Sequence, residues 1–263
     1  MARKSHAKRS HYKHEPDSGR TSKRSRGARR DRPQSADILE INTRYLETAY
    51  TPQRSKEPLE AKTPAQKKYI NAINNNCLTF GIGPAGTGKS YCAAALAAQA
   101  LESGVIERII LTRPAVEAGE QLGFLPGAVD DKFAVYIDAF RDILNERLGA
   151  GAVEYGLRHG RIVAAPLAYM RGKTFNQKTF VILDEAQNTT PAQMKMFLTR
   201  IGEDCTVVIN GDIRQSDIKG PNGLADAVER VKGLSGVYVH SFERDDIVRS
   251  GLVRALIDRY EVF

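Results

Sequence analysis

The sequence lacks a long apolar run. No stretch of its 263 residues approaches the roughly 20 consecutive apolar residues that a membrane-spanning helix needs, and the amino terminus has no apolar segment typical of a signal peptide. We therefore expect a soluble, cytoplasmic protein without a membrane partner. A hydrophobic fraction of 41% is compatible with one sizeable α/β domain, and two full domains would scarcely fit.

Cysteine is scarce, and its spacing argues against a cysteine-based framework. The three cysteines are Cys77, Cys92 and Cys205, and no two of them form a C-x-x-C pair. Each lies in a stretch that predicts a strand or a helix. We therefore expect three reduced core residues, which are neither disulfide partners nor zinc ligands.

Acidic and apolar residues are rare in the first 35 positions. These positions contain twelve Lys and Arg but only three acids, Glu15, Asp17 and Asp31, which gives a net charge of +9. The whole chain carries +8, so the remaining residues carry about −1. Such a segment cannot bury enough surface to offset the entropy cost of ordering. We expect residues 1–60 to form a basic, largely disordered tail and linker, with one apolar patch within 36–58 that packs on the domain, and residues 61–263 to form the compact domain.

The basic tail has two interpretations. It is an electrostatic arm for RNA, DNA or another polyanion, or it is a solubilising extension without a dedicated partner.

The stretch from Cys77 to Gly104 has the order strand, loop, helix. An apolar run at 78–82 precedes a glycine-rich loop, and an alanine-rich segment follows, which Gly104 can end. The loop reads GPAGTGKS and satisfies G-x-x-x-x-G-K-[ST] in the strand-to-helix context that the motif requires. The candidate nucleotide-binding residues are Gly83, Pro84, Ala85, Gly86, Thr87, Gly88, Lys89, Ser90 and Tyr91.

Each residue type in this loop has a chemical reason. Glycines permit positive φ, so successive backbone N–H groups can form an anion nest at the positive end of the following helix. Lys89 can reach the β and γ phosphates as a point charge, and the hydroxyl of Ser90 can ligate Mg²⁺. The alternative, a glycine-rich turn with a chance GKS, is disfavoured by the flanking strand and helix. We expect a nucleotide and Mg²⁺ as cofactors.

A second motif follows the continuous apolar run at 179–183, which predicts a buried parallel strand. It ends in DEAQN, close to a Walker B pattern, and places two acids at the edge of the sheet where ligands of open α/β folds bind. Asp184 would hold Mg²⁺ directly or in its second shell, and Glu185 would act as general base on the attacking water. The alternative is that the two acids only cap a helix.

A third motif follows the apolar run at 206–210, which ends in GDIRQSD. The Gln215 amide at the same sheet edge can sense the γ-phosphate and report hydrolysis to neighbouring loops. An ordinary turn at the end of a strand is the alternative.

Apolar periodicity predicts the remaining elements. Helices are expected from Pro64, at 130–148, from Pro191 and at 246–260, strands at 108–112, 161–165 and 237–242, and loops at 113–127 and 166–178. In the last helix, Ile247 and Val248 are among the residues expected to point inward. Strands that alternate with helices are typical of an α/β fold.

Six segments together resemble the PhoH family, the phosphate-starvation-inducible ATPases of bacteria and their phages. They are GIGPAGTGKS, TRPAVEAGEQLGFLPG, PLAYMRGKTF, ILDEAQNTT, INGDIRQSD and DIVRSGLVRALIDRYE. The resemblance covers residues 63–263 and leaves the tail outside. It implies a RecA-like P-loop NTPase, with a mostly parallel sheet and helices on both faces, related to the ATPase lobe of superfamily 1 helicases. It also implies an additional strand between those that carry GKS and DE.

The same resemblance implies roles for two glutamines. Gln66 would contact the adenine, and Gln215 would occupy the position of the γ-phosphate glutamine.

Superfamily 1 helicases complete their site with arginines from a second lobe, and this chain has room for one lobe. Because an arginine supplied in trans contributes about 10³ to 10⁵ in rate, we expect a head-to-tail oligomer, and the resemblance favours a hexamer. The candidate trans residues are Arg113, Arg171, Arg214 and Arg249, of which Arg171 and Arg249 are favoured.

These observations predict an Mg²⁺-dependent ATPase that works as a ring on single-stranded nucleic acid, RNA rather than DNA, in the manner of a helicase. The alternative is a nucleotide-dependent switch or a protein-remodelling ATPase that has no nucleic-acid substrate.

Overall fold

The computed structural model describes residues 54–55, 57–114, 129–176 and 178–248, together with Gly251 and Arg259, and gives only the backbone of residues 129–136. The expected basic tail and most of the apolar patch that follows it lie outside these residues. So do most of the loop expected at 113–127 and most of the helix expected at 246–260.

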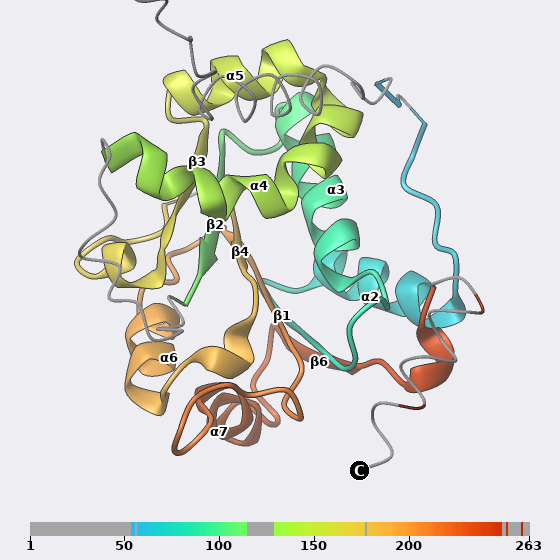
Figure 1. Cartoon of the computed structure of the whole chain (residues 1–263), viewed down its shortest axis with the longest axis vertical. Coiled ribbons are helices and arrows are strands. Elements are labelled where there is room, and N and C mark those ends of the chain that lie inside the picture. Colours follow the sequence, from blue (N-terminus) through green and yellow to red (C-terminus); the bar gives the residue numbers. More distant parts are fainter. Residues whose placement is uncertain are drawn as a thin grey trace, which may run out of the picture. The chain divides into compact units, whose positions relative to one another are not determined.

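All strands in the described part of the chain run parallel in one sheet. In spatial order they are β3 (Ile162–Pro166), β2 (Arg108–Arg113), β4 (Thr179–Leu183), β5 (Thr206–Gly211), β1 (Leu78–Ile82) and β6 (Val237–Ser241) (Figure 1). This confirms the predicted α/β fold with its parallel sheet. Strand β5 lies between β1 and β4, where the family resemblance implied an additional strand.

The register of the strands brings the three motifs to one level. Ile82 at the end of β1 pairs with Gly211 of β5, and Leu183 at the end of β4 pairs with Ile209 of β5. Because parallel strands end at the same edge of a sheet, the segments that follow β1, β4 and β5 meet there.

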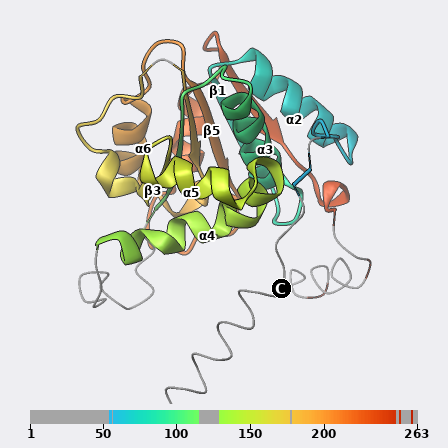
Figure 2. The ribbon, with the colours of Figure 1, turned by 90° about the horizontal axis from the view of Figure 1, so that it is seen from above.

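Helices cover both faces of the sheet, as predicted. On one face lie α2 (Pro64–Asn75), α3 (Lys89–Glu102), α4 (Val129–Leu148) and α5 (Ala150–Arg158), and on the other lie α6 (Pro191–Leu198) and α7 (Gly223–Arg230). Figure 2 shows α2 beside α3, and α5 alongside α4. In β4, Phe180 and Ile182 pack toward α2–α5, whereas Val181 and Leu183 pack toward α6 and α7. Burial on both faces explains why this strand is apolar from Phe180 to Leu183.

Helix α3 carries the end of the phosphate motif and is buried along most of its length. The alanines that give it its composition are fully buried against the sheet, α2 and α4: Ala93, Ala94, Ala95, Ala97 and Ala98. Their small side chains let neighbouring backbones approach closely, which fixes the start of the helix relative to the sheet. Gly104, with φ of 75°, follows the helix and ends it as predicted.

The folded part reaches back to Arg54, before the boundary near residue 61 that the sequence indicated. The N–H of Ser55 donates to the carbonyl of Glu146, and Arg147 donates to the carbonyl of Glu57, each over 2.7 Å. Arg54 also forms an ion pair with Glu102 of α3. A truncation meant to remove the basic tail alone should therefore end before Arg54.

Two short helices were not anticipated. Helix α5 contains Gly151 and Gly156, which lower helix propensity, and α7 is eight residues long. Gly156 is required by packing, because a Cβ at this position would lie 2.8 Å from Cδ1 of Ile162. Tertiary contacts, which a local pattern does not reveal, stabilise these helices.

Two expectations were wrong. Cys77, expected in the core, lies just before β1 and is exposed, although Cys92 and Cys205 are buried. The last helix does not begin at Asp246, because Arg244–Asp246 forms the 3-10 turn η4 and neither Ile247 nor Val248 is helical. Ile247 is buried as expected, but Val248 is 38% exposed because its backbone leaves η4 toward the phosphate loop.

Candidate nucleotide-binding site

The phosphate loop between β1 and α3 depends on its glycines. Gly83, Gly86 and Gly88 have φ of 141°, 82° and 86°, in the region where other residues are strained. At Gly83 a Cβ would also lie 2.4 Å from the carbonyl oxygen of Phe242. The loop is held from outside by the N–H of Val248, which donates to the carbonyl of Gly86 over 2.9 Å. The expected strand, loop and helix are therefore present.

Lys89 turns its amine toward its own loop. Nζ donates to the carbonyl oxygens of Gly83 and Pro84 over 2.6 and 2.7 Å. Burial lowers the pKa of Lys89 below its usual 10.5, whereas nearby carboxylates, Asp212 foremost, act in the opposite direction. A bound phosphate would compete with these carbonyl oxygens for the ammonium group.

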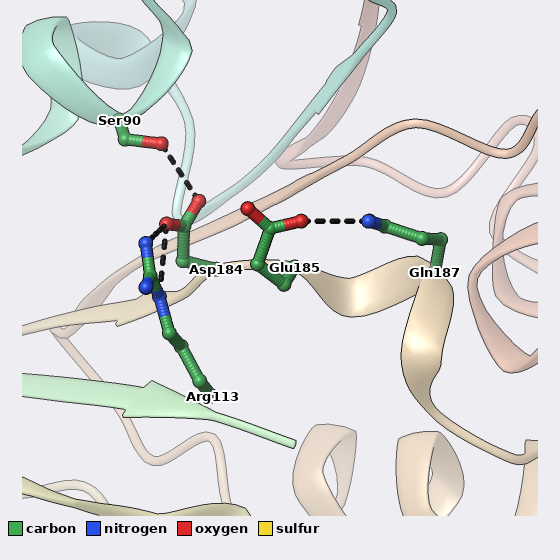
Figure 3. Close-up of polar contacts among 5 residues, drawn as sticks. All are labelled: Ser90, Arg113, Asp184, Glu185 and Gln187. Atoms are coloured by element: carbon green, nitrogen blue, oxygen red, sulfur yellow. Dashed lines mark hydrogen bonds and ion pairs between the residues drawn. The ribbon is translucent and has the colours of Figure 1, made fainter. Parts of the chain in front are cut away.

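Ser90 and Asp184 come together from different elements. The Ser90 hydroxyl, at the start of α3, donates to Oδ1 of Asp184 over 2.7 Å (Figure 3). Asp184 follows β4 and is 3% exposed, and Arg113, the last residue of β2, donates to its other oxygen, Oδ2. The sequence predicted that Ser90 and Asp184 both hold Mg²⁺; the two side chains are in contact, and their role as metal ligands stays a prediction.

These two residues suit Mg²⁺. Because the serine hydroxyl points its hydrogen at the carboxylate, its lone pairs face away from Asp184 and can bind a cation. Hydroxyl and carboxylate oxygens are hard ligands, and Mg²⁺ is usually held by few protein groups while it keeps several waters. Asp184 can act directly or through one of those waters.

Glu185 has a strained backbone. Its φ of 55° and ψ of 37° place it in the left-handed region, which is unusual for a residue other than glycine. Such strain costs about 1–3 kcal/mol and clusters at functional sites. Unlike the buried Asp184, Glu185 is exposed, so its carboxylate can reach a water molecule.

Gln187 is a site residue that the sequence analysis did not single out. It lies in the 3-10 turn η3 (Ala186–Asn188), is 4% exposed, and donates from Nε2 to Oε2 of Glu185 over 2.6 Å (Figure 3). Its Oε1 accepts from the N–H of Asp212 over 3.1 Å. A polar side chain two residues after the proposed base, in a turn that follows a buried strand, was the available signal.

The segment after β5 is tied to the same turn. Asn188 donates to the carboxylate of Asp217 over 3.0 Å and accepts from its N–H over 2.8 Å, and Ser216 donates to the carbonyl of Gln187. Gln215, directly before these anchors, is exposed and lines the cleft beside the phosphate loop. Its location at the sheet edge is as expected.

Gln66 lies against the phosphate loop from the other side. It is 4% exposed, donates from Nε2 to the carbonyl of Thr87 over 2.9 Å, and accepts at Oε1 from the N–H of Lys62 over 2.8 Å. A Cβ on Gly88 would lie 2.6 Å from Gln66 Nε2, so loop and side chain are in close contact. The adenine contact implied for Gln66 stays a prediction.

Tyr91 uses its side chain for packing. Its hydroxyl donates to Glu146 of α4 over 2.8 Å and accepts from Arg147 over 3.2 Å. The phenol therefore joins α3 to α4, and Tyr91 is also among the residues that line the phosphate cleft.

Two clefts open at this edge. One of about 290 Å³ is lined by the phosphate loop together with Asp184 and Glu185, and a larger one of about 920 Å³ is lined by Gly83, Pro84 and the residues that follow β5 and β6. The larger is within the roughly 300–1,000 Å³ usual for ligand sites. Both include Asp212 and Gln215, so they are neighbouring compartments.

The four candidate trans arginines have different environments. Arg113 is bound to Asp184 of its own chain, so this residue is not available as a trans arginine. Arg171 follows the 3-10 turn η2 (Leu167–Met170) and is exposed, as is Arg214. Arg249 lies outside the described residues.

The parallel sheet and its phosphate loop place the chain among the RecA-like P-loop NTPases. A family model described as PhoH-like protein matches residues 58–261, and the chain belongs to this family.

Curated proteins of the same family are similar to the chain over most of its length. The chain is 48% identical over 223 residues to a PhoH-like protein of Bacillus subtilis, covering 82% of this chain and 70% of that protein. It is 48% identical over 211 residues to Protein PhoH of Escherichia coli K12, covering 79% of this chain and 59% of the relative. The match thus spans about 59% to 70% of the relatives' own lengths.

Two solved structures show a weak similarity to this chain. The large terminase of bacteriophage HK97 matches with a TM-score of 0.48 and 14% identity, over 80% of this chain and 49% of that one. The UvsW helicase of bacteriophage T4 matches with a TM-score of 0.45 and 14% identity, over 77% of this chain and 67% of that one.

None of the helices that the structure describes combines the length and the apolar character needed to cross a membrane.

Proposed function

We propose that the protein hydrolyses ATP with Mg²⁺. The loop N–H groups and Lys89 bind the phosphates, Ser90 and Asp184 hold the metal, and Glu185 accepts a proton from the attacking water. Gln215 senses the γ-phosphate, and Gln66 contacts the adenine. The observation that carries the proposal is the 2.7 Å bond between Ser90 and Asp184, with Glu185 next in the chain and in the same cleft.

Phosphate release and nucleotide binding test this proposal together. Lys89→Ala should lose both nucleotide binding and phosphate release, because it removes the positive charge that binds the phosphates. Glu185→Gln should retain binding but lose about 10²- to 10⁴-fold in turnover, the usual contribution of a general base. Glu203→Gln, the same change at an exposed position of a loop, is the control. Turnover of Glu185→Gln at the wild-type rate would refute the assignment of the base.

We also propose that the ATPase works as a ring, with a hexamer favoured, in which Arg171 completes a neighbour's site. Four inter-strand steps separate β3 from β1, about 19 Å at the usual strand spacing, so Arg171 is remote from the phosphate loop of its own chain. An exposed arginine at this edge is available to a second copy. Arg249 is the other candidate.

Mixed oligomers test a shared site. Lys89→Ala and Arg171→Ala should each be inactive, while their mixture should regain turnover, because one subunit then supplies the loop and its neighbour the arginine. The mass of the purified protein reports the number of subunits. Full turnover of Arg171→Ala alone would exclude this residue, and the same pair of measurements then applies to Arg249→Ala.

The proposed substrate that couples to hydrolysis is single-stranded nucleic acid, with RNA favoured. The segment 166–176 contains no acid and exposes Tyr169, Arg171 and Lys173, while Met170 and Phe175 anchor it in the core. A fixed loop with one aromatic and one cation besides Arg171, which is assigned to the neighbour's site, suits a stacked base and a phosphate, and stacking is worth about 1–3 kcal/mol per base.

RNA-stimulated turnover separates this proposal from the alternative. Tyr169→Ala and Lys173→Ala should weaken RNA binding and leave basal turnover intact, whereas Tyr155→Ala, which removes an aromatic of equal 54% exposure on α5, should not. Loss of the Lys173 contact should also make the slope of log binding constant against log salt concentration shallower by about 0.7. If neither RNA nor DNA stimulates turnover, a nucleotide switch or protein-remodelling role replaces the nucleic-acid proposal.

The basic tail is proposed to add to polyanion binding. Deleting residues 1–53, which leaves Arg54 and its contacts in place, should preserve basal turnover and weaken RNA binding. Loss of turnover would contradict the interpretation of the tail as an accessory arm.

A further inference from the structure

The carboxylate of Asp184 is divided between two donors. Arg113 donates to Oδ2 from Nη2 over 2.5 Å and from Nε over 3.2 Å, while Ser90 donates to Oδ1 over 2.7 Å. Figure 3 shows the guanidinium and the serine on opposite sides of the carboxylate. Each oxygen therefore has its own partner, and the orientation of the side chain is determined.

The strand register accounts for this contact. Thr112 of β2 pairs with Leu183 of β4, so the next residues, Arg113 and Asp184, are level at the ends of adjacent strands. The N–H of Asp184 donates to the carbonyl of Thr112 over 2.9 Å, which fixes the backbone at the same point.

Arg113 is itself held in place. Its guanidinium carbon lies 5.4 Å from the centre of the Phe140 ring, which belongs to α4 and is fully buried. A ring face attracts a guanidinium group and restricts its position. The Arg113 side chain is 27% exposed and that of Asp184 is 4% exposed, so the arginine also neutralises a charge that is costly to bury alone.

We propose that Arg113 is a positioning residue for the divalent cation. By binding Oδ2, it keeps Oδ1 toward Ser90, so the two groups that hold Mg²⁺ are aligned before the metal and nucleotide bind. This inference rests on the proposed function, and it assigns to Arg113 a role within its own subunit. The positive charge of Arg113 also repels the Mg²⁺ ion, but the negative charges of Glu185, Asp212 and the phosphates counter that repulsion.

The expected effect is on metal affinity. Partners that orient a metal ligand typically contribute about 10- to 100-fold to metal affinity or activity. We therefore expect Arg113→Ala to raise the free Mg²⁺ concentration required for half-maximal binding of a fluorescent ATP analogue by about tenfold or more. Binding of the same analogue in EDTA should be unchanged, because the phosphate loop does not contact Arg113.

Two variants and one control make the test specific. Arg113→Lys should recover most of the Mg²⁺ affinity, because both arginine donors go to one oxygen and a single ammonium group can replace them. Arg113→Ala should have no further effect in an Asp184→Asn background, where the carboxylate is absent. Arg108→Ala, at the exposed opposite end of β2, should bind Mg²⁺ and analogue as the wild type does.

The possible outcomes are distinct. An unchanged or lowered Mg²⁺ requirement in both Arg113 variants would overturn the inference while leaving the proposed function intact. If the wild-type protein binds no analogue at any Mg²⁺ concentration, the proposed function itself fails. If Arg113→Ala does not fold, Arg113→Lys decides, because a tenfold increase in its Mg²⁺ requirement would contradict recovery by charge.

Discussion

Gln187 donates a 2.6 Å hydrogen bond to the carboxylate of Glu185, and through its other amide atom it accepts from the N–H of Asp212. One buried side chain thus joins the proposed base after β4 to the segment after β5. The Gln187 side chain is tightly packed against β5, because a Cβ on Gly211 would lie 2.7 Å from Gln187 Oε1. We infer that Gln187 holds the Glu185 carboxylate in its orientation.

Gln187→Ala should therefore reduce turnover without reducing nucleotide affinity. A hydrogen bond to a charged group contributes about 1.5–3 kcal/mol, which corresponds to roughly 10- to 100-fold in rate. Single-turnover phosphate release, with binding of an ATP analogue measured in parallel, checks this. Gln99→Ala in α3, remote from Glu185 in the chain, is the control, and equal loss of turnover in both variants would contradict the assignment.

Gln66 has two proposed roles, support of the phosphate loop and contact with the adenine, and its substitution can distinguish them. Because its amide bonds the carbonyl of Thr87, Gln66→Ala should weaken ATP and GTP alike, by about two- to tenfold, the effect of one neutral hydrogen bond. An additional loss for ATP alone would measure the adenine contact. Equilibrium titrations with both nucleotides check this, with Asn71→Ala, an exposed amide of the same helix, as control. Unchanged GTP affinity would exclude the role in supporting the loop.

Short motifs could be located from the sequence because their chemistry is local. Residues 83–90 and 184–185 each occupy a few consecutive positions, and a parallel sheet necessarily brings the ends of its strands to one edge. The partner of Asp184 was not predictable in this way. Arg113 is 71 residues away, and its contact depends on β2 being the neighbour of β4 and on the register of that pair.

The same reason explains the other differences. Tyr69 and Asn210 are 141 residues apart, and their bond becomes visible only once α2 lies across the sheet. Helices α5 and α7 lack the Thr-Pro start that identified the equally short α6. Cys77 lies one residue before β1, so its side chain is exposed although that of Leu78, the next residue, is buried.

Tyr69→Phe should destabilise the fold. The Tyr69 hydroxyl donates to Oδ1 of Asn210 over 2.5 Å, and both residues are fully buried. Nδ2 of Asn210 has no hydrogen-bond partner in the described part of the chain, so the substitution would leave the whole amide unpaired. We expect a loss of about 1–3 kcal/mol in the free energy of unfolding, measured in urea. Tyr238→Phe, at a tyrosine that is 42% exposed, should be nearly neutral, and equal stability of the two variants would contradict the prediction.

His240 should make stability depend on pH. Its ring lies 5.7 Å from that of Tyr69 and 4.6 Å from that of Phe242, and its Nε2 has no hydrogen-bond partner among the described residues. Burial lowers the pKa of His240 below its usual 6.5, with Lys68 acting in the same direction and Asp246 and the Ala65 carbonyl opposing it.

Between the lowered pKa and 6.5, the unfolded chain therefore binds more protons than the folded one, so stability falls as the pH falls through this window. Above it, the histidine is neutral in both states and contributes no slope. Chemical unfolding of wild type and His240→Phe across this range should show the wild type losing stability relative to the variant on the acid side only. His159→Phe, the same substitution at an exposed position, should keep the wild-type slope. Parallel profiles for wild type and His240→Phe would refute the assignment, because the lowered pKa of His240 is the source of the expected difference.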